Sequence, residues 1–177
     1  ARTATPRPGP TSPAAVVARP ATVAPETVTA PTRLEIARIG LSMAVEPVAV
    51  ADDGQMALPT TVRVAGWYRF GPAPGSRAGS SVIAGHVDTA AEGAGPMAGL
   101  AGLRTGDVVE VLSGAERHRY RVDSVQAIRK TSLDLPALFD RSGPPRLHLV
   151  TCGGPYDRDA HHYEDNVVVV ATPLPGD

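Results

Sequence analysis

The chain has 177 residues, 42% of them hydrophobic, and a formal net charge of −1. A chain of this length can form one hydrophobic core and hardly two. The near-neutral net charge argues against a nucleic-acid partner, which would require a basic surface. A single cysteine excludes an internal disulfide and a cysteine-based zinc site. No stretch approaches the ~20 apolar residues of a membrane span. No signal peptide with a basic start and an apolar centre is present either, so we expect any membrane anchor to lie upstream of this chain.

Residues 1–32 hold seven of the 18 prolines and no aromatic residue. Ala, Thr, Val and Pro alternate here without a helical or strand period. Proline removes backbone donors and favours polyproline II, so we predict a semi-stiff linker over 1–32, ahead of a catalytic domain at 33–177. The sequence leaves two alternatives open, an ordinary disordered tail and a tail that folds back onto a groove of its own domain.

From residue 33 onward, short runs of β-forming residues alternate with Gly/Pro turns, and no long amphipathic helix occurs. The predicted strands lie at 34–41, 45–50, 65–70, 80–86, 108–111, 117–128, 147–152 and 166–171. One short helical turn is expected at 133–139. The continuous valine run at 167–170 is typical of a strand buried on both faces. Together these segments predict a single all-β domain, an antiparallel or mixed β-barrel or sandwich.

The only cysteine, Cys152, ends the strand that begins at residue 147, and Gly153, Gly154 and Pro155 follow at once. A thiol at the mouth of a strand, beside flexible backbone, is a reachable nucleophile. The alternative is a buried structural cysteine, because free cysteine is among the most buried residue types. Position alone does not separate these two interpretations.

A thiolate nucleophile needs an imidazole to supply or withdraw a proton. His86 ends an apolar strand and is therefore placed at a strand mouth. The other histidines are His118, His148, His161 and His162. The first alternates with arginines on a predicted solvent face, and the last two fall in a loop. His148 lies about 13 Å from Cys152 along the same straight strand, at ~3.3 Å per residue. By elimination His86 is the best partner, with a lone core histidine as the alternative.

Several segments, in this order, resemble a sortase. They are residues 84–88 (Ala-Gly-His-Val-Asp), 103–109 (Leu-Arg-Thr-Gly-Asp-Val-Val), 149–154 (Leu-Val-Thr-Cys-Gly-Gly) and 163–171 (Tyr-Glu-Asp-Asn-Val-Val-Val-Val-Ala). The order of the segments and the Gly-Trp-Tyr string at 66–68 resemble the actinobacterial class E/F type, and the Thr-Cys-Gly-Gly string favours class F. The resemblance covers residues 33–173.

The resemblance implies a closed eight-stranded β-barrel with short helical turns, and a cysteine transpeptidase at the outer surface of a Gram-positive cell. Such enzymes cut a Leu-Pro-x-Thr-Gly sorting signal between Thr and Gly through a cysteine thioester. An amine of a peptidoglycan precursor or of another protein then accepts the acyl group. Carried over by position, Cys152 is the nucleophile, His86 protonates the leaving amine and Thr151 supports the site. The resemblance implies no cofactor or metal, and we expect a monomer.

The family's third catalytic residue is an arginine near the start of the last strand, where this chain has Glu164, Asp165 and Asn166. An arginine there donates hydrogen bonds to the oxyanion, and losing such a donor typically costs ~3 kcal/mol. We favour Arg158, the only arginine after Cys152, reaching in from its loop. The alternatives are Asn166 as a neutral donor, or impaired activity that leaves a peptide-binding module. Arg158 could instead pair with a neighbouring aspartate on the surface.

Three further patterns are weaker. Residues 58–61 (Leu-Pro-Thr-Thr) resemble a sorting signal without its glycine, and we expect a loop leading into a strand. A metal site built from Asp157, His148, His161 and His162 matches no zinc spacing. An L,D-transpeptidase would carry its histidine two residues before the cysteine, where this chain has Val150.

Overall fold

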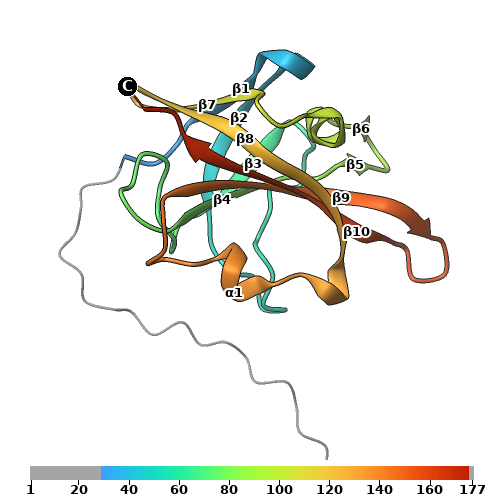
Figure 1. Cartoon of the computed structure of the whole chain (residues 1–177). Coiled ribbons are helices and arrows are strands. Elements are labelled where there is room, and N and C mark those ends of the chain that lie inside the picture. The colour runs from blue at the N-terminus through green and yellow to red at the C-terminus, as the bar shows by residue number, and fades with distance from the viewer. Residues whose placement is uncertain (1–28, 176–177) are drawn as a thin grey trace, which may run out of the picture.

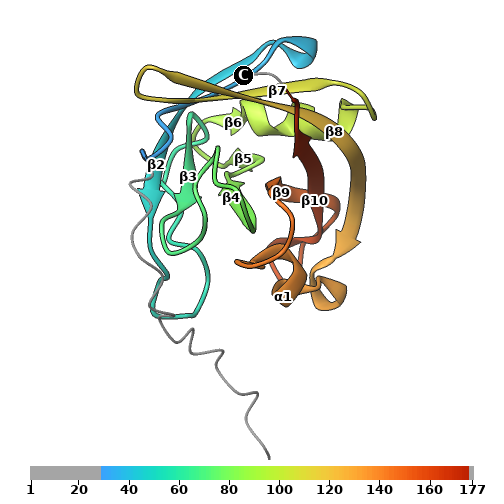
Figure 2. The ribbon, with the colours of Figure 1, turned by 60° about the vertical axis from the view of Figure 1, so that its left-hand side comes forward.

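A closed barrel of eight strands forms the centre of the computed structural model, which describes residues 29–175. Figure 2 shows the ring running from β2 and β3 through β4, β9 and β10 to β8. This architecture confirms the predicted all-β, eight-stranded barrel. The predicted linker falls almost entirely on residues 1–28, which lie outside the described part of the chain. The barrel strands are β1 (Arg33–Ile36), β2 (Leu41–Val48), β3 (Val64–Tyr68), β4 (Ser80–Ala84), β7 (Val108–Ser113), β8 (Glu116–Arg129), β9 (Arg146–Asp157) and β10 (His162–Pro173).

The remaining elements are short. A small two-stranded sheet pairs β5 (Asp88–Thr89) with β6 (Gly93–Ala94). The helical pieces are η1 (Ala37–Ile39), η2 (Pro96–Gly102), η3 (Lys130–Ser132) and α1 (Leu135–Leu138). The predicted helical turn is confirmed by α1, whose N-cap Asp134 accepts a 3.0 Å hydrogen bond from the Ala137 amide. Within residues 29–175, no helix has the length and hydropathy to cross a membrane.

Two apolar clusters, one inside the barrel and one outside, explain the strand patterns. The valine run of β10 is buried on both faces, as predicted: Val167 and Val169 face the barrel interior, whereas Val168 joins the outer cluster. The outer cluster packs Leu138 of α1 against the sheet, and such a buried leucine contributes about 1.5–3 kcal/mol. Figures 1 and 2 both place α1 below β9 and β10, outside the ring.

The sheet is mixed, because β2–β3 and β4–β9 pair in parallel and the other barrel pairs are antiparallel. In the β4–β9 pair, Ala84 lies opposite Val150, and the ladder continues with a 3.1 Å hydrogen bond from the Gly85 amide to the Val150 carbonyl. Since parallel strands run the same way, the residues that follow these two strand positions emerge at the same edge of the barrel.

The sequence prediction that the cysteine strand stops at Cys152 is wrong. Strand β9 continues to Asp157 and forms a hairpin with β10. The register shifts from Gly153 opposite Asp165 to Tyr156 opposite Tyr163, which leaves one extra residue on β9. Gly154 has a φ of +72°, the left-handed conformation of a glycine bulge. The Gly-Gly-Pro string therefore bends the strand and does not end it.

Candidate active site

Cys152 lies on the outer face of the barrel and is half-buried. The neighbouring Thr151 is 3% exposed and faces inward, so strand alternation turns Cys152 outward. The thiol lines two cavities, one of about 680 Å³ and one of about 270 Å³. The cysteine is therefore neither sealed in the core nor fully exposed, and a ligand in either cavity has access to its sulfur.

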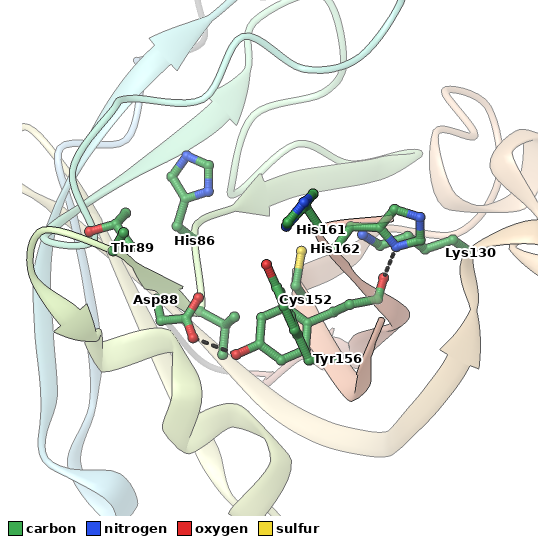
Figure 3. Close-up of a pocket in the computed structure, with 11 residues that line it drawn as sticks. His86, Asp88, Thr89, Lys130, Cys152, Tyr156, His161 and His162 are labelled. Carbon is green, nitrogen blue, oxygen red and sulfur yellow. Dashed lines mark hydrogen bonds between the residues drawn. The ribbon is translucent and has the colours of Figure 1, made fainter. Parts of the chain in front are cut away.

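His86 lies beside this thiol because of the parallel β4–β9 register. Ala84 pairs with Val150, so His86 and Cys152 each come two residues after a directly paired position. Adjacent strands are ~4.8 Å apart, which makes these two residues near neighbours just beyond the end of β4. His86 is half-buried and lines both cavities together with Cys152. Figure 3 shows the imidazole to one side of the sulfur. The structure thus brings together the two residues that the sequence analysis paired.

Thr151 connects the strand of the cysteine to the segment of the histidine. Its hydroxyl donates a 2.8 Å hydrogen bond to the carbonyl of Gly85, the residue before His86. Both residues are buried, so the bond is shielded from water. Thr151 also contributes to the lining of the larger cavity.

The larger cavity, called the groove below, is an apolar channel on the outside of the sheet. Its floor comes from strands β4, β9 and β10, and its sides come from the segments 54–58 and 133–139. The apolar lining residues are Met56, Leu58, Val82, Ala84, Leu133, Leu135, Leu138, Phe139 and Val150. Residues 58–61 form a loop, as predicted, and Leu58 belongs to the groove wall. The groove is suited to an extended peptide with apolar side chains, and it ends at Cys152 and His86.

His148 holds one side of the groove in place. The ring is 4% exposed, and its Nδ1–H donates a 2.8 Å hydrogen bond to the carbonyl of Leu138 in α1. Burial lowers the pKa of His148, and the charge of Arg146 acts in the same direction.

In the part of the chain that the structure describes, no three His, Cys, Asp or Glu side chains are grouped so as to hold a metal ion.

The smaller cavity shares the thiol with the groove, and most of its lining side chains carry a polar group. Its lining residues are His86, Val87, Asp88, Thr89, Ala90, Lys130, Cys152, Tyr156, His161, His162 and Tyr163 (Figure 3). His86, Lys130, Cys152 and His162 also line the groove. Cys152 and three of its neighbours therefore belong to the lining of both cavities.

A model of the sortase domain matches residues 34–174. The chain belongs to the sortase family. Among curated proteins, none matches this sortase. Sortase C-1 from Actinomyces oris is 22% identical, with a TM-score of 0.62 over 82% of this chain and 72% of the other. The sortase D5 transpeptidase of Clostridium perfringens is 16% identical, with a TM-score of 0.60 over 82% and 79%. Sortase A from Listeria monocytogenes is 15% identical, with a TM-score of 0.59 over 82% and 87%.

Residues 164–166, where the family resemblance led us to expect an arginine, are Glu, Asp and Asn. Asn166 lies directly opposite Cys152 in the β9–β10 ladder and lines the groove. Arg158 lies in the exposed turn between β9 and β10, and it lines neither cavity. Within residues 29–175 it forms no ion pair with Asp157 or Asp159. The assignment of Arg158 to the oxyanion stays a prediction.

The sequence analysis missed a contact between Asp88 and Tyr163. The Tyr163 phenol donates a short hydrogen bond to the Asp88 carboxylate. This bond raises the pKa of Tyr163, and burial and the nearby Asp88 charge raise it further. Tyr163 also packs edge-on against Tyr156, with ring centroids 5.1 Å apart. Asp88 belongs to the Gly-His-Val-Asp segment that carries the family resemblance, which was the one signal available in the sequence.

Proposed function

We propose that this sortase is a cysteine transpeptidase that cleaves a Leu-Pro-x-Thr-Gly-like sorting signal between Thr and Gly and transfers the acyl group to an amine on the cell wall. The observation that carries the proposal is the parallel register of Ala84 with Val150, which sets His86 beside Cys152 at the end of an apolar groove. A nucleophile and its proton donor at the end of a peptide-sized channel fit acyl transfer.

The reaction follows from the chemistry of a thiolate and an imidazolium. The Cys152 sulfur attacks the threonine carbonyl carbon, and the carbonyl π pair moves onto oxygen. When that pair returns, the C–N bond breaks and His86 gives its proton to the leaving glycine amine. The acceptor amine then attacks the thioester and gives its proton to His86, and the thiolate leaves. Thr151 positions the two residues through Gly85.

Substrate recognition is assigned to the groove. The leucine and proline of the signal are placed against its apolar side chains, whose burial provides the binding energy. Asn166 projects into the groove opposite Cys152, and its amide is suited to hydrogen-bond the backbone of the bound peptide. We further propose action at the outer face of the cell membrane and membership of class F. The segment resemblance supports both assignments.

The decisive experiment incubates the full chain with a Leu-Pro-x-Thr-Gly peptide and hydroxylamine. Hydroxylamine attacks the Cys152 thioester, so the wild-type protein yields a peptide hydroxamate that mass spectrometry detects. We expect Cys152→Ala to give none, because it removes the acyl carrier. A Cys152→Ala protein that forms the hydroxamate at the wild-type rate contradicts the proposal.

A second candidate function is a sortase-shaped module that binds peptide without turning it over. The specific observation in its favour is the Glu164-Asp165-Asn166 string where the family carries its arginine. Peptide binding by the wild-type protein, measured by calorimetry, without hydroxamate formation supports this module over the enzyme.

A further inference from the structure

Lys130 is the only lysine or arginine among the residues that line the two cavities at Cys152. It lines both of them together with Cys152 and His86. In Figure 3, His86 and Lys130 lie on opposite sides of the sulfur. A carbonyl held over the sulfur thus has the proton donor on one side and a positive charge on the other.

The strand register explains how a residue of β8 comes near a thiol on β9. Cys152 pairs with Asn166, and Asn166 pairs with Ile128, so these three side chains form one row on the same face of the sheet. Lys130 follows Ile128 by two residues, which keeps it on that face where β8 gives way to η3. Strand β10 separates β8 from β9, so the two backbones lie two strand spacings, or about 10 Å, apart. The flexible four-carbon side chain of Lys130 can bring its ammonium group closer to Cys152 than its backbone is.

Lys130 forms no ion pair with a carboxylate in the described part of the chain. Among residues 29–175, no Asp or Glu oxygen lies within 4.0 Å of its ammonium group. Glu164, one of the two acidic residues of β10, instead lies 3.9 Å from the guanidinium of Arg129. Arg129 lines neither cavity. Arg129 is therefore paired with Glu164 outside the two cavities, whereas the adjacent Lys130 lines both cavities at Cys152.

We propose that Lys130 is a catalytic residue of this sortase, whose ammonium group stabilises the oxyanion formed on the scissile carbonyl. The inference rests on the proposed transpeptidase function. When the sulfur attacks and the π pair moves onto oxygen, Lys130 donates a hydrogen bond to that oxygen and keeps its proton. The pair returns as the C–N bond breaks, and the proton on the leaving amine comes from His86. The same donation acts when the acceptor amine attacks the thioester.

The test compares Lys130→Met, Lys130→Gln and Lys130→Arg in the full chain, with Arg129→Met as the matched neighbour that removes a charge outside the site. Hydroxamate formation gives kcat and KM. We expect Lys130→Met and Lys130→Gln to lower kcat by about 10²–10³-fold, with little change in KM, because the oxyanion exists only during reaction. Lys130→Arg restores part of kcat, and Arg129→Met stays close to the wild type. The rate of Cys152 alkylation by iodoacetamide shows that the thiol remains accessible in each variant.

Two results overturn the inference. One is a Lys130→Met protein that turns over at the wild-type kcat while Cys152→Ala is inactive. The other is an Arg158→Ala protein that loses more kcat than Lys130→Met, which returns the role to the arginine predicted from sequence. A wild-type protein that forms no product overturns the proposed function itself, so the two failures are distinguishable.

Discussion

At the scale of single residues, the segment that carries His86 is tied to the sheet on both sides of the histidine. Thr151 bonds to the carbonyl of Gly85, one residue before it, and Tyr163 bonds to Asp88, two residues after it. Both donors belong to β9 and β10, the hairpin that also holds Cys152. These two side-chain hydrogen bonds add to the β4–β9 register in holding the segment of the imidazole against the strands beside the thiol.

Tyr163→Phe removes one of these bonds and keeps the ring. We expect kcat to fall, by as much as about 100-fold, because a small displacement of a catalytic group is costly. KM for the peptide should change little, since Tyr163 does not line the groove. The measurement is hydroxamate kinetics. Tyr156→Phe is the control, because its hydroxyl makes no hydrogen bond to another side chain within residues 29–175. Equal kcat in Tyr163→Phe and the wild type contradicts a positioning role.

The positions of Lys130 and Tyr163 near the thiol could not be predicted from the sequence. Cys152 and His86 stand out in the sequence through their residue types and through the strand ends predicted at both positions. The link from Tyr163 to Asp88 spans 75 positions, and the approach of Lys130 depends on the β8–β10 register. No local pattern encodes which residue of one strand lies opposite which residue of a distant strand, so these side chains were not predictable as neighbours of the thiol.

At the scale of elements, the connection from β8 to β9, which contains η3 and α1, packs over the outer face of the sheet. The helix α1 packs Leu138 against Val82 and Val168, and His148 below it bonds to the Leu138 carbonyl. This connection forms one side of the groove. Its attachment depends on a histidine that is buried in the neutral form.

Acidification should weaken this attachment. Burial lowers the pKa of His148 in the folded state, whereas in the unfolded chain it titrates near ~6.5. Below that value the unfolded state binds the proton more readily, so the free energy of unfolding falls as pH decreases from about 6.5 towards the lowered pKa. We expect urea unfolding between about pH 7.5 and 5.5 to show a steeper loss of stability for the wild type than for His148→Gln. Parallel pH profiles of the two proteins contradict this assignment.

The hairpin of β9 and β10 shows why one prediction about elements failed. A Gly-Gly-Pro string after a strand is a common termination signal. In this hairpin the antiparallel partner extends the ladder past the string, and Gly154 in the left-handed conformation absorbs the extra residue. Local sequence therefore located the distortion correctly but could not reveal the partner strand that continues beyond it.

At the scale of the whole molecule, the barrel is closed by its shortest strand. The four residues of β1 pair with β2 on one side and with β7 on the other. Leu34 and Ile36 point into the interior and are 0% exposed. The backbone of Thr32 already bonds to Leu112 and Val45, so the barrel's hydrogen bonding begins just before β1.

Removing β1 should open the barrel. A chain that begins at Leu41 loses two core side chains, each worth about 2–5 kcal/mol, and exposes the edges of β2 and β7. We expect it to aggregate or to unfold without a cooperative transition. A chain that begins at Thr29 keeps every strand pairing found within residues 29–175 and should unfold in one cooperative transition. Differential scanning calorimetry of the three chains tests this, and a cooperative transition in the shortest one contradicts it.

The all-β architecture and most strand positions followed from the two-residue period and the turn residues. Closure depends on β1 meeting β7, whose paired residues are more than 70 positions apart, as with Glu35 and Glu110. The choice between barrel and sandwich was therefore not decided by periodicity, and it was the family resemblance that predicted closure.

The groove takes its floor from paired strands and its sides from two connecting segments, 54–58 and 133–139, outside the barrel ladder. The sides of the groove are thus built by other parts of the chain than the strand that carries Cys152. Substitutions in those two segments should change the selectivity of the groove and leave the β4–β9 register at Cys152 and His86 unchanged. The same division makes the two segments the natural place to diversify when a sortase of altered selectivity is wanted.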